Sequence, residues 1–261
     1  MPFFDSRRPQ IFAHRGGCAL GPENTLAAFD LGLQAGADGL ELDVHLSADG
    51  VPVVHHDARL DRTTSLSGPL AACTAAELAR ADAGCRYSRD GGFPFRQQGV
   101  GIPSLREVLT RYRDVPIVIE MKVNSAEMGE AVAREVRRAD AVDRVCLAGY
   151  GARSAAAARA AIPEIATSAT HPEVRLAVYR GLAGWPVRHA AYGVYQVPER
   201  TGLIRIVSRR FVRNAHNAGL KVQVWTVDDE ADMRRLLEWG VDGLITNRPD
   251  LAVRVRDACC P

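Results

Sequence analysis

Ionisable side chains close several short apolar segments of this chain. His14 ends an apolar run, and Glu41 and Asp43 stand two residues apart in a second one. Glu120 and Lys122 repeat that two-residue spacing in a third. Because alternate side chains of a β-strand point to the same face, the members of each pair are expected to face one side of a sheet.

Three carboxylates gathered in one small space repel one another unless a positive charge lies among them. Glu41, Asp43 and Glu120 would form such a group if their segments were neighbouring strands. All-oxygen ligand sets suit hard cations, so Mg²⁺, Ca²⁺ or Mn²⁺ is favoured over zinc. These residues therefore predict a site for one divalent cation.

Two histidines and two basic residues extend this chemistry. His14 and His56 could exchange protons near neutral pH, and Arg15 and Lys122 suit an anionic group. Together with a cation that polarises phosphoryl oxygens, one histidine could deprotonate the attacking oxygen and the other could protonate the leaving alkoxide. Taken singly, each residue is weak evidence, because a strand-end histidine is more often structural and an acid–base pair can be an ordinary surface ion pair.

A turn sequence predicts which residues of the second segment meet the segment that follows it. Asp49-Gly50 lies between alternating apolar residues, which is a strong hairpin signal. A two-residue loop there would pair Ala48 with Val51 and would set Asp43 opposite His56.

The elements that position these residues alternate along the chain. Eight strand candidates cover residues 11–14, 39–44, 116–121, 145–149, 164–168, 191–197, 221–227 and 242–246. Helical patterns cover 24–35, 104–113, 126–139, 152–161, 208–218 and 229–238. This alternation, in 261 residues, favours a (β/α)₈ TIM barrel. The second choice, an open doubly wound sheet, lacks its usual G-x-G-x-x-G turn after the first strand.

Residues 58–101 interrupt the alternation, with one short helix expected at 74–81. A segment of this length is typically functional or a small subdomain, and it should lie over the carboxyl end of the barrel, where barrel active sites lie. We expect one barrel domain over residues 1–261, with this insertion after the second strand and its hairpin.

Composition excludes several classes of protein. Hydrophobic residues make up 47% of the chain, charged residues make up 25%, and the net charge is +2. These values are ordinary for a globular protein, and no basic block points to nucleic acid. No apolar run is long enough for a transmembrane segment. The six cysteines form no C-x-x-C pair, and the first residues contain no apolar signal core, so a reducing cytoplasmic setting is expected. No pattern indicates a particular oligomeric state.

The sequence resembles the glycerophosphodiester phosphodiesterase family over most of its length, apart from a looser stretch at about 125–192. The matching motifs occur in family order. They are AHRG at 13–16, PENT at 22–25, ELDV at 41–44, VHHD at 54–57, LDRTT at 60–64, DAG at 82–84, IPSL at 102–105 with EVL at 107–109, IEMK at 119–122, VWTV at 224–227 and GVDGLITNRP at 240–249.

The resemblance implies a (β/α)₈ barrel that hydrolyses glycerophosphodiesters to glycerol 3-phosphate and an alcohol such as choline or ethanolamine. Attack by water and attack by the glycerol 2-hydroxyl, through a cyclic intermediate, both remain open. By position, the resemblance implies the following roles: His14 and His56 as catalytic acid and base, Glu41, Asp43 and Glu120 as metal ligands, Arg15 and Lys122 at the phosphate, and Trp225 at the glycerol.

Three alternatives use the same residues differently. A lysophospholipase D acting on single-chain lipids would have an apolar mouth, which Phe93, Pro94 and Phe95 could provide. A catalytically silent barrel would bind a phosphodiester without cleaving it, although the complete set of site residues argues against this. A divalent-metal lyase would not need two histidines.

Two residues near the predicted site need separate comment. Asn247 stands where the family often has Asp, which affects only local hydrogen bonding. Cys18 follows the first motif and is expected to be inert, with oxidation that blocks the site as a second hypothesis.

Overall fold

The computed structural model describes every residue except 1, 7, 150, 183–186, 188–189 and 260–261. In this part of the chain, eight parallel strands form a ring in the order β6-β5-β4-β2-β1-β11-β10-β7. A bridge between Ser168 and Val194 joins the two ends of this order, so the barrel closes. The strands are β1 (Gln10–His14), β2 (Gly39–Leu46), β4 (Ile117–Met121), β5 (Val145–Ala148), β6 (Ala166–Thr167), β7 (Val194–Pro198), β10 (Lys221–Trp225) and β11 (Gly243–Thr246). The predicted barrel and its eight strand segments are confirmed.

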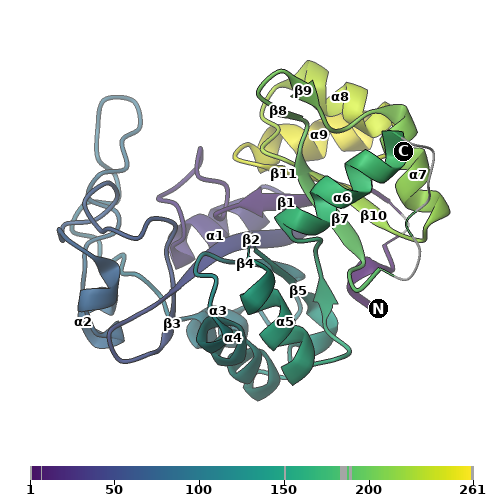
Figure 1. The fold of residues 1–261 in the computed structure, drawn as a ribbon. Helices are drawn as coiled ribbons and strands as arrows, with labels where there is room; N and C mark the ends of the chain where they lie inside the picture. The colour runs from purple at the N-terminus through teal and green to yellow at the C-terminus, as the bar shows by residue number, and fades with distance from the viewer. Residues whose placement is uncertain (1, 7, 150, 183–186, 188–189, 260–261) are drawn as a thin grey trace.

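A helix follows each barrel strand and covers its outer face (Figure 1). These helices are α1 (Leu26–Gln34), α3 (Leu105–Arg111), α4 (Ala126–Arg138), α5 (Ala152–Ala161), α6 (His171–Leu182), α7 (Arg209–Asn217), α8 (Glu230–Glu238) and α9 (Pro249–Cys259). The sequence patterns identified six of them and missed α6 and α9. Both begin with signals that were present: Thr170 and Glu173 form a T-x-x-E pattern, and Pro249 opens α9.

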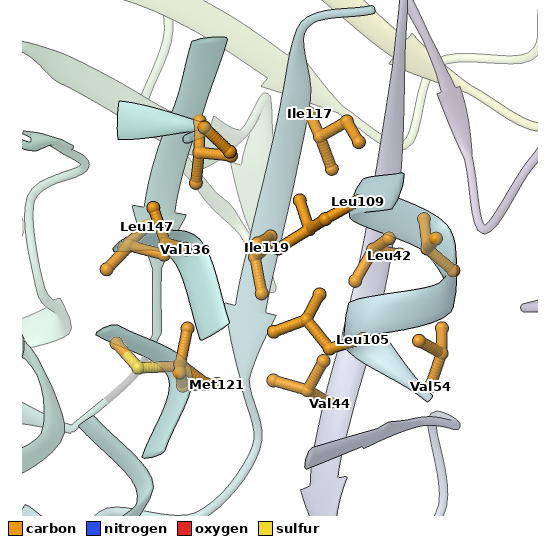
Figure 2. Packing of buried hydrophobic residues seen from close by; sticks show 14 of the residues in the cluster. Leu42, Val44, Val54, Leu105, Leu109, Ile117, Ile119, Met121, Val136 and Leu147 are labelled. Carbon is orange, nitrogen blue, oxygen red and sulfur yellow. The ribbon is translucent and has the colours of Figure 1, made fainter. Parts of the chain in front are cut away.

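Alternation along the strands separates the outer core from the barrel interior. On β2, Leu42 and Val44 pack against α3 and α4 together with apolar residues of β4, as Figure 2 shows, and Leu40 belongs to the same buried cluster. Each such buried side chain contributes roughly 1.5–3 kcal/mol of hydrophobic free energy. The intervening residues, Glu41 and Asp43, therefore face the interior. A smaller apolar cluster that includes Phe3 and Phe12 lies apart from this outer core.

The hairpin register differs from the prediction by one residue. Strand β3 (Pro52–Val54) runs antiparallel to β2 with Val44 opposite Val54, and the amide of His55 donates to the carbonyl of Asp43 at 3.0 Å. The loop contains three residues rather than two, because Ser47 pairs with Val51. Within this loop Gly50 adopts a left-handed conformation with φ of +72°, as three-residue hairpin loops commonly require. Asp43 therefore lies opposite His55, and His56 comes just after this pair.

The insertion packs around its own apolar cluster and projects from one side of the ring (Figure 1). It contains a 3-10 helix at Leu70–Ala72 and α2 at Ala75–Ala79, which confirms the predicted short helix. A capping box between Thr74 and Glu77 starts α2. A second small excursion, the hairpin of β8 (Arg200–Thr201) and β9 (Ile204–Arg205), follows β7. Within the described residues, no helix has the length and apolar character that a membrane crossing requires.

Candidate active site at the carboxyl end of the barrel

Three carboxylates meet at the carboxyl ends of β2 and β4. Glu41 and Asp43 are buried, and Asp43 is the direct neighbour of Glu120 in the strand register. One oxygen from each of the three side chains lies within 4.8 Å of the others. The predicted grouping of these residues is therefore present in the fold.

This cluster is electrostatically costly when only protein atoms are present. Burial raises the pKa of Glu41 well above its usual range, and the nearby Asp43 and Glu120 raise it further. Burial also raises the pKa of Glu120, although the neighbouring Lys122 opposes this. The site thus favours a positive charge among its oxygens.

Two basic side chains supply part of that charge. Lys122 Nζ lies 3.1 Å from Asp43 Oδ1 and 3.1 Å from Glu120 Oε1, and Arg15 Nε lies 3.2 Å from Asp43 Oδ2. Among the described residues, Arg15 Nε and Asp43 Oδ1 are the buried side-chain atoms that make no directed hydrogen bond. An all-oxygen cluster with such an unsatisfied oxygen has the donor chemistry of a hard divalent cation.

Asn24 binds the carboxylate oxygen of Asp43 that Lys122 does not contact. Its amide nitrogen donates to Asp43 Oδ2 at 2.8 Å, and its carbonyl oxygen accepts from the Asp43 amide at 3.2 Å. Asn24 adopts a left-handed conformation with φ of 58°. Because this conformation is not helical, α1 begins later than predicted, with Thr25 as its N-cap. Asn24 therefore positions the Asp43 carboxylate through direct contacts.

His14 ends β1 beside Glu41, with Nε2 3.9 Å from Glu41 Oε2. Its Nδ1 lies 2.6 Å from Asn247 Oδ1, while the Asn247 amide nitrogen donates to Asp228 Oδ2 at 2.7 Å. Because Asp228 binds the nitrogen of the Asn247 amide, the oxygen must face His14, and Nδ1 of His14 carries the proton. Burial lowers the pKa of His14. Nε2 is therefore left as an acceptor on the side of the carboxylates.

His56 follows β3 and belongs to a chain of charged groups. Its Nδ1 lies 2.6 Å from Asp57 Oδ1, and Arg62 Nε donates to Asp57 Oδ2 at 2.6 Å. Arg62 also donates to both oxygens of Glu23, which accepts from Arg15 at 3.0 Å. Arg62, through its hydrogen bond, holds the pKa of Asp57 well below its usual range. The sequence patterns did not predict these supporting roles, although Arg62 and Glu23 lay within the matching motifs.

Trp225 and two further histidines also lie near the carboxyl end of the barrel. Trp225 ends β10 next to Pro198 of β7 and is partly buried. Two other histidines bind backbone: His45 Nε2 lies 3.0 Å from the carbonyl oxygen of His56, and His55 Nε2 lies 3.3 Å from that of Arg59. These contacts give both histidines a structural role.

Cys18 is expected to resist alkylation at neutral pH in the native protein. Its thiol donates to Asn247 Oδ1 at 2.8 Å. Burial raises the pKa of Cys18 to about 11, so little reactive thiolate forms. Labelling with iodoacetamide at pH 7, followed by peptide mass mapping, checks this, with the partly exposed Cys73 as internal reference. Labelling of Cys18 as fast as that of Cys73 would contradict the assignment and restore the oxidation hypothesis.

A family model, curated relatives and solved structures all relate this chain to phosphodiesterases. The model of the glycerophosphoryl diester phosphodiesterase family matches residues 14–251. The glycerophosphodiester phosphodiesterase of Bacillus altitudinis is 32% identical over 254 residues, covering 95% of this chain and 98% of that protein. That of Caldanaerobacter subterraneus subsp. tengcongensis is 30% identical over 258 residues, covering 94% and 96%. A solved Oleispira antarctica phosphodiesterase, in complex with the product sn-glycerol-3-phosphate, is 26% identical with a TM-score of 0.79 and coverage of 96% and 97%.

Proposed function

Because the chain belongs to the glycerophosphodiester phosphodiesterase family, we propose that this site hydrolyses glycerophosphodiesters to glycerol 3-phosphate and an alcohol. The observation that carries the proposal is the carboxylate cluster at the carboxyl end of a barrel, with His14 beside Glu41 and with His56 acting on the charge of Glu120. The product complex of the Oleispira relative supports a small-molecule substrate. No contact in the described part of the chain favours a lysophospholipase D or a silent binding barrel. We also propose that residues 1–261 form one domain.

Glu41, Asp43 and Glu120 would hold the divalent cation, which we propose to be Mg²⁺ or Ca²⁺, with Mn²⁺ as a further choice. When bound, the cation polarises the phosphoryl oxygens. Lys122 and Arg15 lie against the same cluster and would bind the remaining charge of the phosphate. Trp225 would line the glycerol end of the pocket.

The two histidines divide the proton transfers between them. Asn247 keeps the proton of His14 on Nδ1, so Nε2 accepts a proton from the attacking hydroxyl or water. Asp57 accepts a hydrogen bond from Nδ1 of His56 and fixes the orientation of its ring, and His56 protonates the leaving alkoxide. Under this division His14 is the base and His56 is the acid.

Release of glycerol 3-phosphate by the purified protein tests the function. Glycerophosphocholine and glycerophosphoethanolamine are incubated with the protein in chelator and then with added Mg²⁺, Ca²⁺ or Mn²⁺. We expect release that depends on the added cation. A folded protein that releases no glycerol 3-phosphate with any of the three cations would contradict the proposal.

Asn247→Ala is expected to lower kcat by about tenfold to 10²-fold while KM stays within about twofold, because an unanchored imidazole loses its reactive orientation. Asn247→Asp keeps an oxygen acceptor for Nδ1 but replaces the donor to Asp228 Oδ2 with a second carboxylate, so it should restore only part of the rate. Nitrogen NMR shifts of His14 should show mixed tautomers in the alanine variant.

Asn214→Ala on α7 serves as the matched control, because this exposed side chain belongs to no site. An unchanged kcat and an unchanged His14 tautomer in Asn247→Ala would show that Asn247 does not position His14.

A further inference from the structure

The β8–β9 hairpin presents an apolar tip to solvent. Leu203 is 98% exposed and Ile204 is 66% exposed, the two highest values for large apolar side chains in the described part of the chain. Thr201 pairs with Ile204 across a two-residue turn, in which Gly202 has φ of +57°, as tight hairpin turns require. The turn therefore holds Leu203 at the end of the hairpin, where burial is favourable only through an external partner.

The base of this hairpin is held firmly against the barrel. The carboxylate of Glu199 accepts two hydrogen bonds from Arg235, at 2.7 and 2.9 Å. The carbonyl of Glu199 accepts from the amides of Ile206 and Val207 at 2.9 and 3.2 Å. Because these contacts anchor the base, the hairpin holds Leu203 and Ile204 at a fixed place on the surface.

The surroundings of the tip are basic. Residues 199–210 contain four arginines and one glutamate, and that glutamate pairs with Arg235 and, at 3.5 Å, with Arg205. Arg200 and Arg205 pair across the two strands of the hairpin. Apolar side chains bordered by arginine are the combination that binds an anionic phospholipid surface, where the tip enters the interface and the arginines remain at the headgroups. An apolar surface of a partner protein would not need arginines around the tip, so an anionic lipid surface fits this hairpin better.

The hairpin also lies at the edge of the barrel that carries the site. It starts directly after Pro198, which is the strand neighbour of Trp225. Both residues end parallel strands, so the hairpin rises from the carboxyl end of the barrel. A surface that binds the tip would therefore lie on the same side of the molecule as the candidate active site.

We propose that the β8–β9 hairpin docks the protein on anionic phospholipid surfaces through Leu203 and Ile204, with Arg200 at the headgroups. The functional consequence rests on the proposed function: docking keeps the site close to a bilayer whose lipids become glycerophosphodiesters when their acyl chains are removed. The docking surface itself stands independently of catalysis.

Sedimentation with vesicles tests the docking surface. One set of vesicles contains phosphatidylcholine and phosphatidylglycerol in equal amounts, and the other contains phosphatidylcholine alone. The sedimentation measurements are made in chelator, so that vesicle binding is measured without hydrolysis. We expect binding to the anionic vesicles that weakens with added salt, and little binding to the neutral ones.

The double variant Leu203→Ser/Ile204→Ser should bind the anionic vesicles at least about tenfold more weakly, because two apolar side chains no longer leave water. Arg200→Gln should weaken binding by a smaller factor. Leu176→Ser is the matched control, because Leu176 is also an exposed leucine, 55% exposed on α6, and should leave binding unchanged. Hydrolysis of water-soluble glycerophosphocholine should stay within about twofold in the double variant.

Several results would overturn the proposal. These are no sedimentation of the unaltered protein, equal binding by the double variant, equal binding to neutral vesicles, or an equal loss in Leu176→Ser. Concentration-dependent self-association that disappears in the double variant, without vesicle binding, would instead assign the tip to a second copy of this chain. Vesicle binding without any hydrolysis of glycerophosphocholine would contradict the proposed function and leave the docking surface in place.

Discussion

His14→Ala and His56→Ala are each expected to lower kcat by at least about 10²-fold, the usual size of a general acid or base contribution. In the first variant, the attacking oxygen loses the acceptor that Asn247 orients toward the carboxylate cluster. In the second, the leaving alkoxide loses the donor that Asp57 supports. KM should change little, because neither histidine is expected to carry the main charge of the phosphate.

Initial rates of glycerol 3-phosphate release over a range of glycerophosphocholine concentrations measure this effect. His216→Ala is the matched control, because His216 binds Asp242 and lies before β10, at the opposite end of the barrel. Near-normal turnover in either site variant would remove that histidine from the mechanism. Loss of turnover in His216→Ala would show that the assay reports general damage.

Glu41→Gln and Asp43→Asn are expected to raise the cation concentration needed for half-maximal activity by at least about 10²-fold, more than the effect of mutating a group that only supports a ligand. Each change keeps the shape of the side chain while removing one charged oxygen from the cluster. Titration of activity with Mg²⁺, Ca²⁺ and Mn²⁺ measures the shift. Glu107→Gln, at an exposed carboxylate in the first turn of α3, is the control. An unchanged titration in both site variants would refute the ligand assignment.

Thermal unfolding offers a second measurement that needs no substrate. A cation that binds only the folded protein raises its melting temperature, so the unaltered protein should gain stability with added cation, whereas Glu41→Gln should gain much less. In chelator, Glu41→Gln should melt at a higher temperature than the unaltered protein at any pH where Glu41 is ionised. The variant lacks the buried charge that Asp43 and Glu120 repel.

The pH dependence of stability in chelator follows from the raised pKa of Glu41. In the unfolded chain this carboxyl ionises around its ordinary pKa value of 4.5, below its pKa in the folded protein. The unfolded state therefore releases its proton first as pH rises, and the contribution of Glu41 to stability falls until its folded pKa is passed. Added cation should reduce this fall, since it favours the ionised carboxylate. Unfolding curves at several pH values, with and without cation, measure the difference.

Local sequence patterns were enough to predict the barrel and to group most residues of the candidate site. Apolar periodicity and helix start and stop residues are local signals, so all eight barrel strands could be located before the fold was known. Strand alternation is equally local, and it placed Glu41 with Asp43 and set Glu120 two residues before Lys122 on the same face. Parallel strands in a barrel present their carboxyl ends at one mouth, so these strand-end residues had to meet there.

Three features of the molecule depend on contacts between distant segments, which local patterns do not contain. The hairpin register depends on a third loop residue, and a single-residue slip exchanges which histidine lies opposite Asp43. The tautomer of His14 depends on Asn247, which is 233 positions away along the chain. The exposure of Leu203 is likewise a property of the packed molecule, since only packing leaves one apolar residue in water while others are buried. Strand identity follows from short-range periodicity, whereas proton positions and exposed surfaces follow from contacts between distant segments.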